Sequence, residues 1–371
     1  MLRPCYAEID LAAIAHNLAE YKRVAPVASQ FMAVVKADAY GHGAEAVLHK
    51  AIEAGVDWAG VALVEEAIEL RKQGFTLPIL LLGGIFPPAL PFLVEYQITP
   101  VAYSLDCLNL LTHFAKEHKI RLKIHLKLDT GMGRLGLNLS QYQEFLKGYD
   151  PLQGVEIDGL MTHFACADEA DKSYSLAQVE SFNAFKKLGE GIINPTWVHL
   201  SNSAGTSELD PHGANLFRIG IGLYGQQPSD QLVSPLNLQA AMSFKASIMQ
   251  LQWHPEGACL GYGATFTTTK RSLIATLCVG YADGLPRKLS NIGRVLVRGV
   301  SCPIVGRISM DTTLIDVTSV ASVKLFDLVT LMGKDQNEEI TAMEIAQLTG
   351  TINYEITCGI SQRVPRIYKN E

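Results

Sequence analysis

The stretch Val34-Val35-Lys36-Ala37-Asp38-Ala39-Tyr40-Gly41-His42-Gly43 continues an apolar run that begins at Phe31. The small and β-branched residues Phe31–Val35 predict a short buried strand, and the glycines after it predict a loop. Lys36 then stands at the carboxyl end of a strand. Burial among apolar neighbours would lower the pKa of its amine and make it a nucleophile able to form a Schiff base, whereas a solvated lysine at a strand end has no such role.

The alternation of a strand and a helix recurs along the chain. Asp10 is expected to cap a helix through about Ala25, and the strand Phe31–Val35 follows it. Further helical patterns are Ala44–Ala54, Val64–Lys72, Leu105–Lys116 and Tyr174–Lys187. Further strand patterns are Trp58–Ala62, Ile79–Leu82, Ile98–Val101, Leu122–Leu128, Ile157–Thr162, Trp197–Leu200 and Phe217–Leu223. These eight alternations predict an α/β fold, a closed parallel (β/α)8 barrel of the TIM type.

From about Pro228 the pattern changes to short β-branched segments between turn residues. The predicted strands are Ala240–Gln252, Arg271–Val279, Gly293–Val297, Cys302–Val305, Thr312–Val317 and Leu328–Met332, with a helix near Ala342–Leu348. We therefore expect a barrel over residues 10–230 and a mostly β domain over residues 231–371, with residues 1–9 able to pack with the second domain. The length of 371 residues allows both, since such a barrel alone takes about 250 residues.

The composition bounds the class of protein. A net charge of −6 argues against a surface for nucleic acid or anionic membrane, and 48% hydrophobic with 18% charged residues is typical of a well-buried enzyme. Glycines and prolines interrupt the most apolar stretch, Leu77–Val94, so it predicts a buried strand, a loop and a helix start rather than a membrane span. Seven scattered cysteines without a C-x-x-C pair, and no signal pattern, favour a cytoplasmic location.

Polar residues gather at the predicted carboxyl ends of the barrel strands, where barrel enzymes carry their chemistry. They are Lys36, Lys127 with Asp129 and Arg134, His163, Ser201-Asn202-Ser203, and Arg218. Any one of them could be a structural strand end. Five strand ends with titratable or amide groups favour a shared pocket.

Two glycine-rich runs follow the seventh and eighth predicted strands, His199–Gly205 and Arg218–Gly225. Their hydroxyls, glycine N–H groups and tyrosine suit a phosphate, although a glycine-rich turn without a ligand would have the same composition. A phosphate site combined with a Schiff-base lysine indicates pyridoxal 5′-phosphate.

The segment Lys36–Gly43 resembles the cofactor-lysine signature of alanine racemase. The resemblance continues in the same order through Lys127–Gly136, Thr162–Ala165, Ser201–Ala204, Phe217–Gly225, Gly261–Gly263, Gly280–Gly284, Gly306–Asp311 and Ile352–Glu355. It implies a pyridoxal-phosphate barrel with a C-terminal β domain that works as a head-to-tail homodimer. The implied activity is the interconversion of L-alanine and D-alanine, which supplies D-alanine for peptidoglycan.

The resemblance also implies residue roles. Racemisation removes the Cα proton from one face and returns one to the other, so two bases are the simplest solution. The residues that match the family's two bases are Lys36, which acts on the D side, and Tyr262 of the partner subunit, which acts on the L side. Arg218 would face the pyridine nitrogen without giving it a full proton. The implied contacts to the cofactor are Lys36, Tyr40, His163, Asn202, Ser203, Arg218, Gly220, Ile221 and Tyr354.

Arg134, with the backbone of Met310 from the partner subunit, is matched to the substrate carboxylate. Lys127 matches a lysine that some family members carry as a carbamate. Because an unmodified Lys127 near Arg134 would repel it, we expect an anionic group between them. The resemblance implies an entrance corridor that includes Asp168, Tyr281, Arg287, Arg307 and Ile352.

Three other interpretations compete with this one. A decarboxylase of basic amino acids on the same fold would carry an acidic residue where Arg218 stands, and a non-catalytic pyridoxal-phosphate-binding protein would have no use for Tyr262. A Schiff-base aldolase would lack the cofactor. His163, Cys166 and Asp168 resemble a metal cluster but lack a second ligand pair, so we expect no metal.

Overall fold

The computed structural model describes residues 2–150 and 154–370, which form two compact units. The β unit comprises the described residues through Ala13, the segment Tyr40–Gly43 and the residues from Gln239 onward. The barrel unit comprises Ile14–Ala39 and Ala44–Leu238. The domain division predicted after residue 230 compares with a division after Leu238 in the structure.

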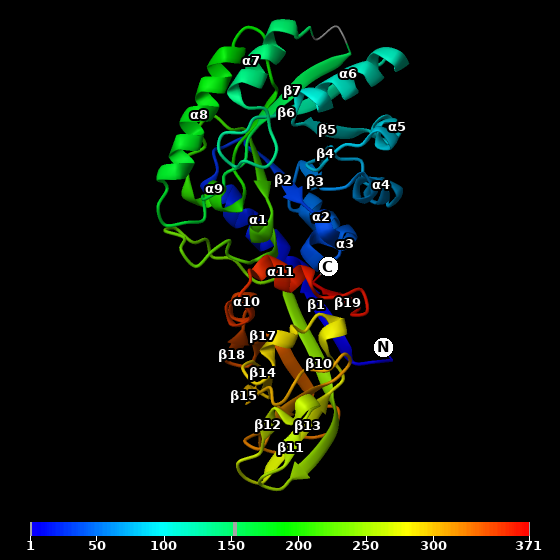
Figure 1. The fold of residues 1–371 in the computed structure, drawn as a ribbon, viewed down its shortest axis with the longest axis vertical. Helices are drawn as coiled ribbons and strands as arrows, with labels where there is room; N and C mark the ends of the chain where they lie inside the picture. Colours follow the sequence, from blue (N-terminus) through cyan, green and yellow to red (C-terminus); the bar gives the residue numbers. More distant parts are fainter. Residues whose placement is uncertain (1, 151–153, 371) are drawn as a thin grey trace. The chain divides into compact units, whose positions relative to one another are not determined.

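The barrel unit is built on an eight-stranded parallel sheet, as predicted, in the order β8-β7-β6-β5-β4-β3-β2-β9 (Figure 1). Its strands are β2 (Gln30–Val34), β3 (Trp58–Val61), β4 (Ile79–Leu81), β5 (Ile98–Ala102), β6 (Leu122–Lys127), β7 (Val155–Met161), β8 (Trp197–His199) and β9 (Leu216–Ile219). At the two terminal strands of this order, the N–H of Asn215, the residue before β9, donates to the Val198 carbonyl in β8 at 3.0 Å. The sheet therefore curls into a nearly closed barrel, and the predicted fold class is confirmed.

Helices connect the strands on the outside of the barrel (Figure 1). They are α1 (Leu11–Val24), α3 (Ala44–Glu53), α4 (Val64–Lys72), α5 (Leu90–Glu95), α6 (Leu105–His118), α7 (Leu139–Gly148), α8 (Ser173–Gly189) and the short α9 (Ser203–Glu208), with a 3₁₀ turn, η1, at Pro87–Ala89. One buried layer inside the barrel takes a side chain from each of six strands: Met32, Trp58, Leu80, Val101, Met161 and Leu216. The polar strand ends follow this apolar layer.

The backbone after Lys36 differs from the predicted loop. Residues Lys36–Gly41 form a helical turn, α2, in which Ala37, Asp38, Ala39 and Tyr40 have φ of 52–53°. These values belong to a left-handed helix, which is unfavourable for residues with a Cβ. Three hydrogen bonds hold the turn in the barrel unit: Ala39 N–H to the Val35 carbonyl at 2.8 Å, Ala37 N–H to the Glu66 carboxylate at 2.6 Å, and Ala44 N–H to the Asp38 carboxylate at 2.7 Å.

The last barrel strand is shorter than the predicted Phe217–Leu223. It ends at Ile219, and a 3₁₀ turn, η3, follows at Ile221–Tyr224. The Gly220 and Gly222 N–H groups donate to the Ser203 hydroxyl at 3.0 and 3.2 Å instead of to a neighbouring strand. The prediction of a strand through residue 223 was therefore wrong, because a side chain replaces the sheet as hydrogen-bond partner.

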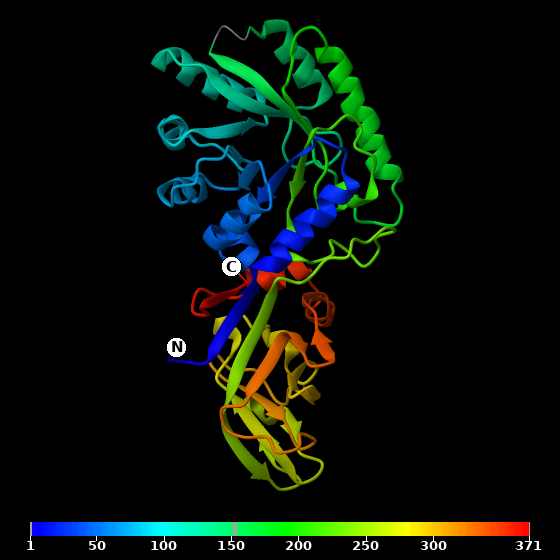
Figure 2. The same ribbon diagram turned by 180° about the vertical axis from the view of Figure 1, so that it is seen from behind.

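The β unit contains a sheet in the order β15-β14-β17-β10-β1-β19, with β13, β16 and β18 attached beside this path. Its strands are β1 (Cys5–Asp10), β10 (Met242–His254), β13 (Ser272–Leu277), β14 (Arg294–Val297), β15 (Val300–Pro303), β16 (Thr313–Asp316), β17 (Leu328–Asp335), β18 (Glu338–Ile340) and β19 (Arg366–Lys369). Figure 2 shows β10 running beside β17. Pairing is antiparallel except between β1 and β19, so the mostly β domain is confirmed, and β1 belongs to its sheet.

The remaining elements of the β unit are short. They are the hairpin β11 (Cys259–Leu260) and β12 (Phe266–Thr267), the helices α10 (Ala342–Thr349) and α11 (Asn353–Cys358), and the 3₁₀ turns η4 (Tyr262–Ala264), η5 (Tyr281–Asp283) and η6 (Arg287–Leu289). None of the seven cysteines, all within the described ranges, is in a disulfide. Among the described residues no helix is both long and apolar enough to span a bilayer.

Candidate active site

The predicted site residues of the barrel unit follow the carboxyl ends of parallel strands, which open at one mouth of the barrel. Lys36 comes two residues after β2, Lys127 ends β6, His163 comes two residues after β7, Ser203 begins α9 after β8, and Arg218 lies in β9. Arg134 is exposed in the loop after β6. A register of parallel strands thus brings residues from distant parts of the chain to one mouth, as the sequence predicts.

These side chains form a cluster of positive charge. Burial lowers the pKa of Lys127 to about 8, and the nearby charges of Arg218, Arg134 and Lys36 act in the same direction. Burial, followed by the charge of Arg218, also holds the pKa of His163 well below its usual value. Lys127 is only 5% exposed. A mouth with this much positive charge is suited to a ligand that carries anionic groups.

The loop that carries Arg134 is fixed by one carboxylate. The Gly131 and Gly133 N–H groups both donate to Asp129 Oδ1 at 3.0 Å. At the base of the loop, the Leu137 N–H donates to the Lys127 carbonyl at 2.9 Å. The exposed guanidinium is therefore carried on a closed loop anchored next to Lys127.

Arg218 is buried and surrounded by acceptors. Its guanidinium donates to the His199, Thr162 and Leu200 carbonyls at 2.9–3.0 Å, and to the imidazoles of His199 and His163 at 2.9 and 3.1 Å. Burial lowers the pKa of Arg218 to about 9, so it remains protonated at neutral pH. No acidic side chain is among these partners.

The guanidinium sets the tautomers of the histidines around it, because it can only donate. His199 Nδ1 and His163 Nδ1 must accept from Arg218, so each ring is neutral and carries its proton on Nε2. His199 Nε2 then donates to His125 Nδ1 at 2.8 Å, so His125 is also an Nε2–H tautomer. Burial lowers the pKa values of His199 and His125, the latter to about 3, which agrees with neutral rings.

His125 was not singled out from the sequence, and His199 entered only as the first residue of the run His199–Gly205. A signal was present in β6, where Lys123, His125 and Lys127 lie on one face, because alternate residues of a strand share one face. A polar side chain on a strand buried on both faces needs a partner. This argument would have directed attention to both histidines.

A second group of residues forms a cup at the ends of β8 and β9. Ser203 Oγ accepts from two N–H groups, those of Gly220 and Gly222, which uses both acceptor positions of the hydroxyl and leaves its proton to donate elsewhere. The Ile221 N–H begins η3, where no earlier turn supplies an acceptor. Tyr224 Oη, at the end of η3, donates to the Val34 carbonyl at 2.8 Å and ties the cup to the strand that leads to Lys36.

Asn202 has a local task in the structure. Its side-chain oxygen accepts from the Gly205 N–H at 2.9 Å and caps α9. The predicted contact of Asn202 with a cofactor stays a prediction. Asp168, predicted to line an entrance corridor, is half-buried in the loop after β7.

The β unit carries the remaining predicted residues, and several are exposed apolar side chains. Tyr262 is 70% exposed, Ile352 60%, Met310 52% and Tyr281 41%. Arg287 and Arg307 are exposed as well. The buried Tyr40 lies beside Tyr354, with ring centroids 6.1 Å apart. Such exposure of large apolar side chains on one unit is typical of a surface that another surface covers.

The described residues contain no group of three or more His, Cys, Asp or Glu side chains that could hold a metal ion. Cys166 is half-buried in the loop after β7, and burial raises the pKa of its thiol. A thiol that stays protonated is a poor metal ligand.

Comparison with known proteins identifies the family. The model "Alanine racemase, N-terminal domain" matches residues 9–228, and "Alanine racemase, C-terminal domain" matches residues 241–368. An alanine racemase from Halothermothrix orenii is 43% identical over 373 aligned residues, which cover 100% of this chain and 98% of that protein.

Solved structures agree. The alanine racemase of Bacillus anthracis with bound L-Ala-P is 35% identical, with a TM-score of 0.93 over 99% of this chain and 95% of that one. The alanine racemase of Bartonella henselae with covalently bound pyridoxal phosphate is 30% identical, with a TM-score of 0.90 over 99% of each chain. The chain therefore belongs to the alanine racemase family and is an isomerase.

Proposed function

We propose that this enzyme interconverts L-alanine and D-alanine with pyridoxal 5′-phosphate and two bases, Lys36 and Tyr262. The observation that carries the proposal is the buried, protonated Arg218 at the barrel mouth, in a chain that matches alanine racemases over its whole length. A decarboxylase of the same fold would need an acidic residue in that place, and no observation favours that alternative.

The barrel residues fit the cofactor. The hydroxyl proton of Ser203 and the Ile221 N–H are donors suited to a phosphate, and the positive charge around Lys127 suits an anion. Lys36 would hold the cofactor covalently. The other predicted contacts are Tyr40, His163, Asn202, Arg218, Gly220 and Tyr354. When bound, pyridoxal phosphate makes the Cα proton of an amino acid acidic by taking up the electron pair that remains.

The two bases would then move one proton at the substrate Cα. Lys36 would act on the D side, and Tyr262 of the partner subunit on the L side. The Nε2–H of His163, whose tautomer Arg218 determines, can donate to the phenolate oxygen of that tyrosine and stabilise its charge. A homodimer is part of this proposal, and the exposed position of Tyr262 on its own chain supports it.

Arg134 would hold the substrate carboxylate together with the Met310 backbone of the partner subunit. A carbamate on Lys127 would place a negative charge between Lys127 and Arg134. The lowered pKa of Lys127, about 8, supports this, because only the neutral amine adds to carbon dioxide. Asp168, Tyr281, Arg287, Arg307 and Ile352 would line the entrance.

Two substitutions test the base assignment. Lys36→Ala should lose the visible absorbance of the bound cofactor, whereas Tyr262→Phe should keep it and lose Cα hydrogen–deuterium exchange from L-alanine in heavy water. Tyr96→Phe, on the half-buried tyrosine that ends α5, is the control and should change neither. Normal exchange in Tyr262→Phe would contradict the two-base mechanism.

Mixing the same two inactive variants tests the shared site. If Tyr262 serves the neighbouring subunit, a dimer of one Lys36→Ala chain and one Tyr262→Phe chain has one intact site, so random mixing should restore about a quarter of the wild-type activity. No restored activity after verified subunit exchange would contradict the sharing. A supply of D-alanine for peptidoglycan, and a cytoplasmic location, complete the proposal. Growth of a D-alanine-requiring bacterium carrying this gene tests the former.

A further inference from the structure

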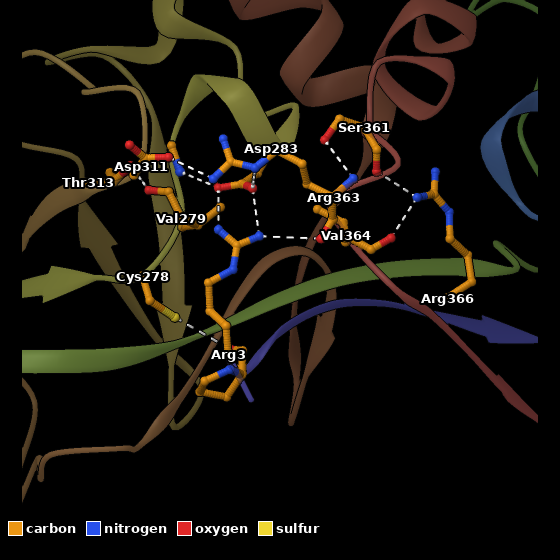
Figure 3. Close-up of polar contacts among 12 residues, drawn as sticks. Arg3, Cys278, Val279, Asp283, Asp311, Thr313, Ser361, Arg363, Val364 and Arg366 are labelled. Atoms are coloured by element: carbon orange, nitrogen blue, oxygen red, sulfur yellow. Dashed lines mark hydrogen bonds and ion pairs between the residues drawn. The ribbon is translucent and has the colours of Figure 1, made fainter. Parts of the chain in front are cut away.

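One fully buried carboxylate in the β unit forms ion pairs with two arginines that are far from it in the sequence. Asp283 accepts from Arg3 through both oxygens, at 2.7 and 3.0 Å, and the Arg363 guanidinium lies 3.6 Å from Oδ1. The Asp283 side chain is 0% exposed. Figure 3 shows both guanidinium groups reaching the same carboxylate. Residues from before β1 and from before β19 are thereby tied to the turn η5.

The same carboxylate shapes its own turn. Asp283 Oδ2 accepts from the Gly280 N–H at 3.0 Å, and the Asp283 carbonyl accepts from the Ser361 N–H at 3.1 Å. Every partner of the Asp283 side chain is therefore a donor or a cation: Oδ2 accepts from Arg3 and Gly280, and Oδ1 accepts from Arg3 and forms an ion pair with Arg363. A buried carboxylate with this set of donors is held in one orientation.

The turn η5 is hydrogen-bonded to the loop that carries Met310. The Tyr281 N–H donates to the Ser309 carbonyl at 3.0 Å, and the Ala282 N–H donates to the Met310 carbonyl at 3.1 Å. A Cβ on Gly280 would lie 2.3 Å from the Met310 carbonyl oxygen, so the two loops are in close contact. Arg363 also pairs with Asp311 at 2.7 Å and fixes the far side of the second loop (Figure 3).

The paired loops present a donor to the outside. The Met310 carbonyl is engaged, the side chain is 52% exposed, and the described part of the chain offers no acceptor to the Met310 N–H. An N–H fixed in direction but without a partner is suited to an anionic ligand group.

We propose that Asp283 is a positioning residue for the substrate carboxylate: through Arg3 and Arg363 it holds the paired loops that aim the Met310 N–H. This inference rests on the proposed function, in which that N–H binds alanine. It adds that residues near both ends of the chain control substrate affinity without touching the substrate.

The sharpest probe is Asp283→Asn in the holoenzyme. An amide has one acceptor and one donor end, so either orientation places an NH2 group against an Arg3 N–H and against a second group, the Gly280 N–H or the Arg363 guanidinium. Arg3→Met removes the arginine that hydrogen-bonds both oxygens of Asp283 and leaves the carboxylate itself in place. Arg3→Lys keeps the positive charge but cannot form the paired hydrogen bonds. Arg294→Met is the matched control, because Arg294 also pairs with carboxylates in the β unit and its side chain is 32% exposed, as is that of Arg3.

The readout is the affinity for propionate, which has the carboxylate and methyl of alanine but no amine, measured by ligand-observed NMR. We expect Asp283→Asn and Arg3→Met to weaken propionate binding and to raise KM for both alanine enantiomers by about tenfold, the effect of one impaired charge-assisted hydrogen bond. Arg3→Lys should lie in between. Cofactor absorbance should not change, and Arg294→Met should alter only the thermal midpoint.

Unchanged propionate affinity in a folded Arg3→Met enzyme would overturn the inference, even if Asp283→Asn fails to fold. So would a loss of kcat with KM unaltered. If the wild-type protein does not racemise alanine, the proposed function itself fails, and this outcome is distinguishable because it appears before any variant is made.

Discussion

Replacing Ala37 by glycine should not weaken the protein, although the same replacement in an ordinary helix does. Ala37 is exposed and has φ of 53°, whereas Ala19 is exposed within the right-handed helix α1. The left-handed conformation costs a residue with a Cβ about 1–2 kcal/mol. Glycine loses more freedom on folding than alanine, and this difference costs about 1 kcal/mol. We therefore expect Ala37→Gly to raise the free energy of unfolding by about 0–1 kcal/mol and Ala19→Gly to lower it by about 1 kcal/mol.

Comparing the two variants separates the cost of the left-handed backbone from the entropy that glycine adds to the unfolded chain. Both add the same freedom to the unfolded chain, so the difference between their effects reports the left-handed conformation alone, about 1–2 kcal/mol. Urea denaturation of wild type and both variants, with unchanged m-values, measures it. The hydrogen bond from residue 37 to Glu66 uses the backbone N–H and survives the substitution. If Ala37→Gly destabilises the protein as much as Ala19→Gly, the left-handed turn after Lys36 is not strained and the reasoning fails.

Substitutions at three residues of the barrel mouth, His199, Ser203 and Lys127, test it further. His199→Leu leaves a buried donor of Arg218 without its acceptor and should lower the free energy of unfolding by about 1–3 kcal/mol. His199→Gln, which offers an acceptor and a donor, should lower it less. Chemical denaturation measures both changes. Ser203→Ala should weaken binding of pyridoxal phosphate about tenfold or more, because the phosphate loses the hydroxyl donor that the Gly220 and Gly222 N–H groups hold in place. Ser207→Ala on the same helix should not weaken it, and a cofactor titration measures both. In carbon-dioxide-free buffer, Lys127→Met should stabilise the protein near neutral pH. The pKa of Lys127 is lowered from 10.5 to about 8 in the folded protein. Its contribution to the free energy of unfolding is therefore most favourable above pH 10.5 and is lost as the pH falls through 8. The stability gained by Lys127→Met should accordingly shrink as the pH rises from 8 to 10.5.

Much of the barrel could be predicted because burial follows the local pattern of apolar residues. The helix expected at Val64–Lys72 has those bounds in the structure, and the strand expected from Trp58 begins there. Most barrel strands are short apolar runs that end at a turn or polar residue, and the helices show their apolar spacing. The order of the strands then requires no further information, since consecutive parallel strands with right-handed crossovers are neighbours in a barrel.

The turn after Lys36 could not be predicted in the same way. Ala37 and Tyr40 carry no preference for left-handed backbone, and Asp38, which tolerates it as a single residue, does not distinguish a left-handed turn from a loop. The conformation is imposed from outside the segment, by the Glu66 carboxylate on one peptide N–H and by the bond from Ala44 to Asp38. Pattern reasoning placed Lys36 just after a barrel strand but did not predict the backbone conformation that follows it.

The chain of His199 and His125 beside Arg218 was not predicted from the apolar pattern, but hydrogen-bonding requirements could have predicted it. On β6, Leu126 is as buried as His125, because both faces of a parallel barrel strand are covered, so apolar patterning cannot distinguish the faces. The requirement for hydrogen bonds can. A buried guanidinium has only donors, so its partners must be carbonyls, carboxylates or neutral imidazoles. Where a barrel sequence places one arginine and several histidines on inward strand positions and no acid, the histidines must be the neutral acceptors, and their tautomers follow from the arginine outward.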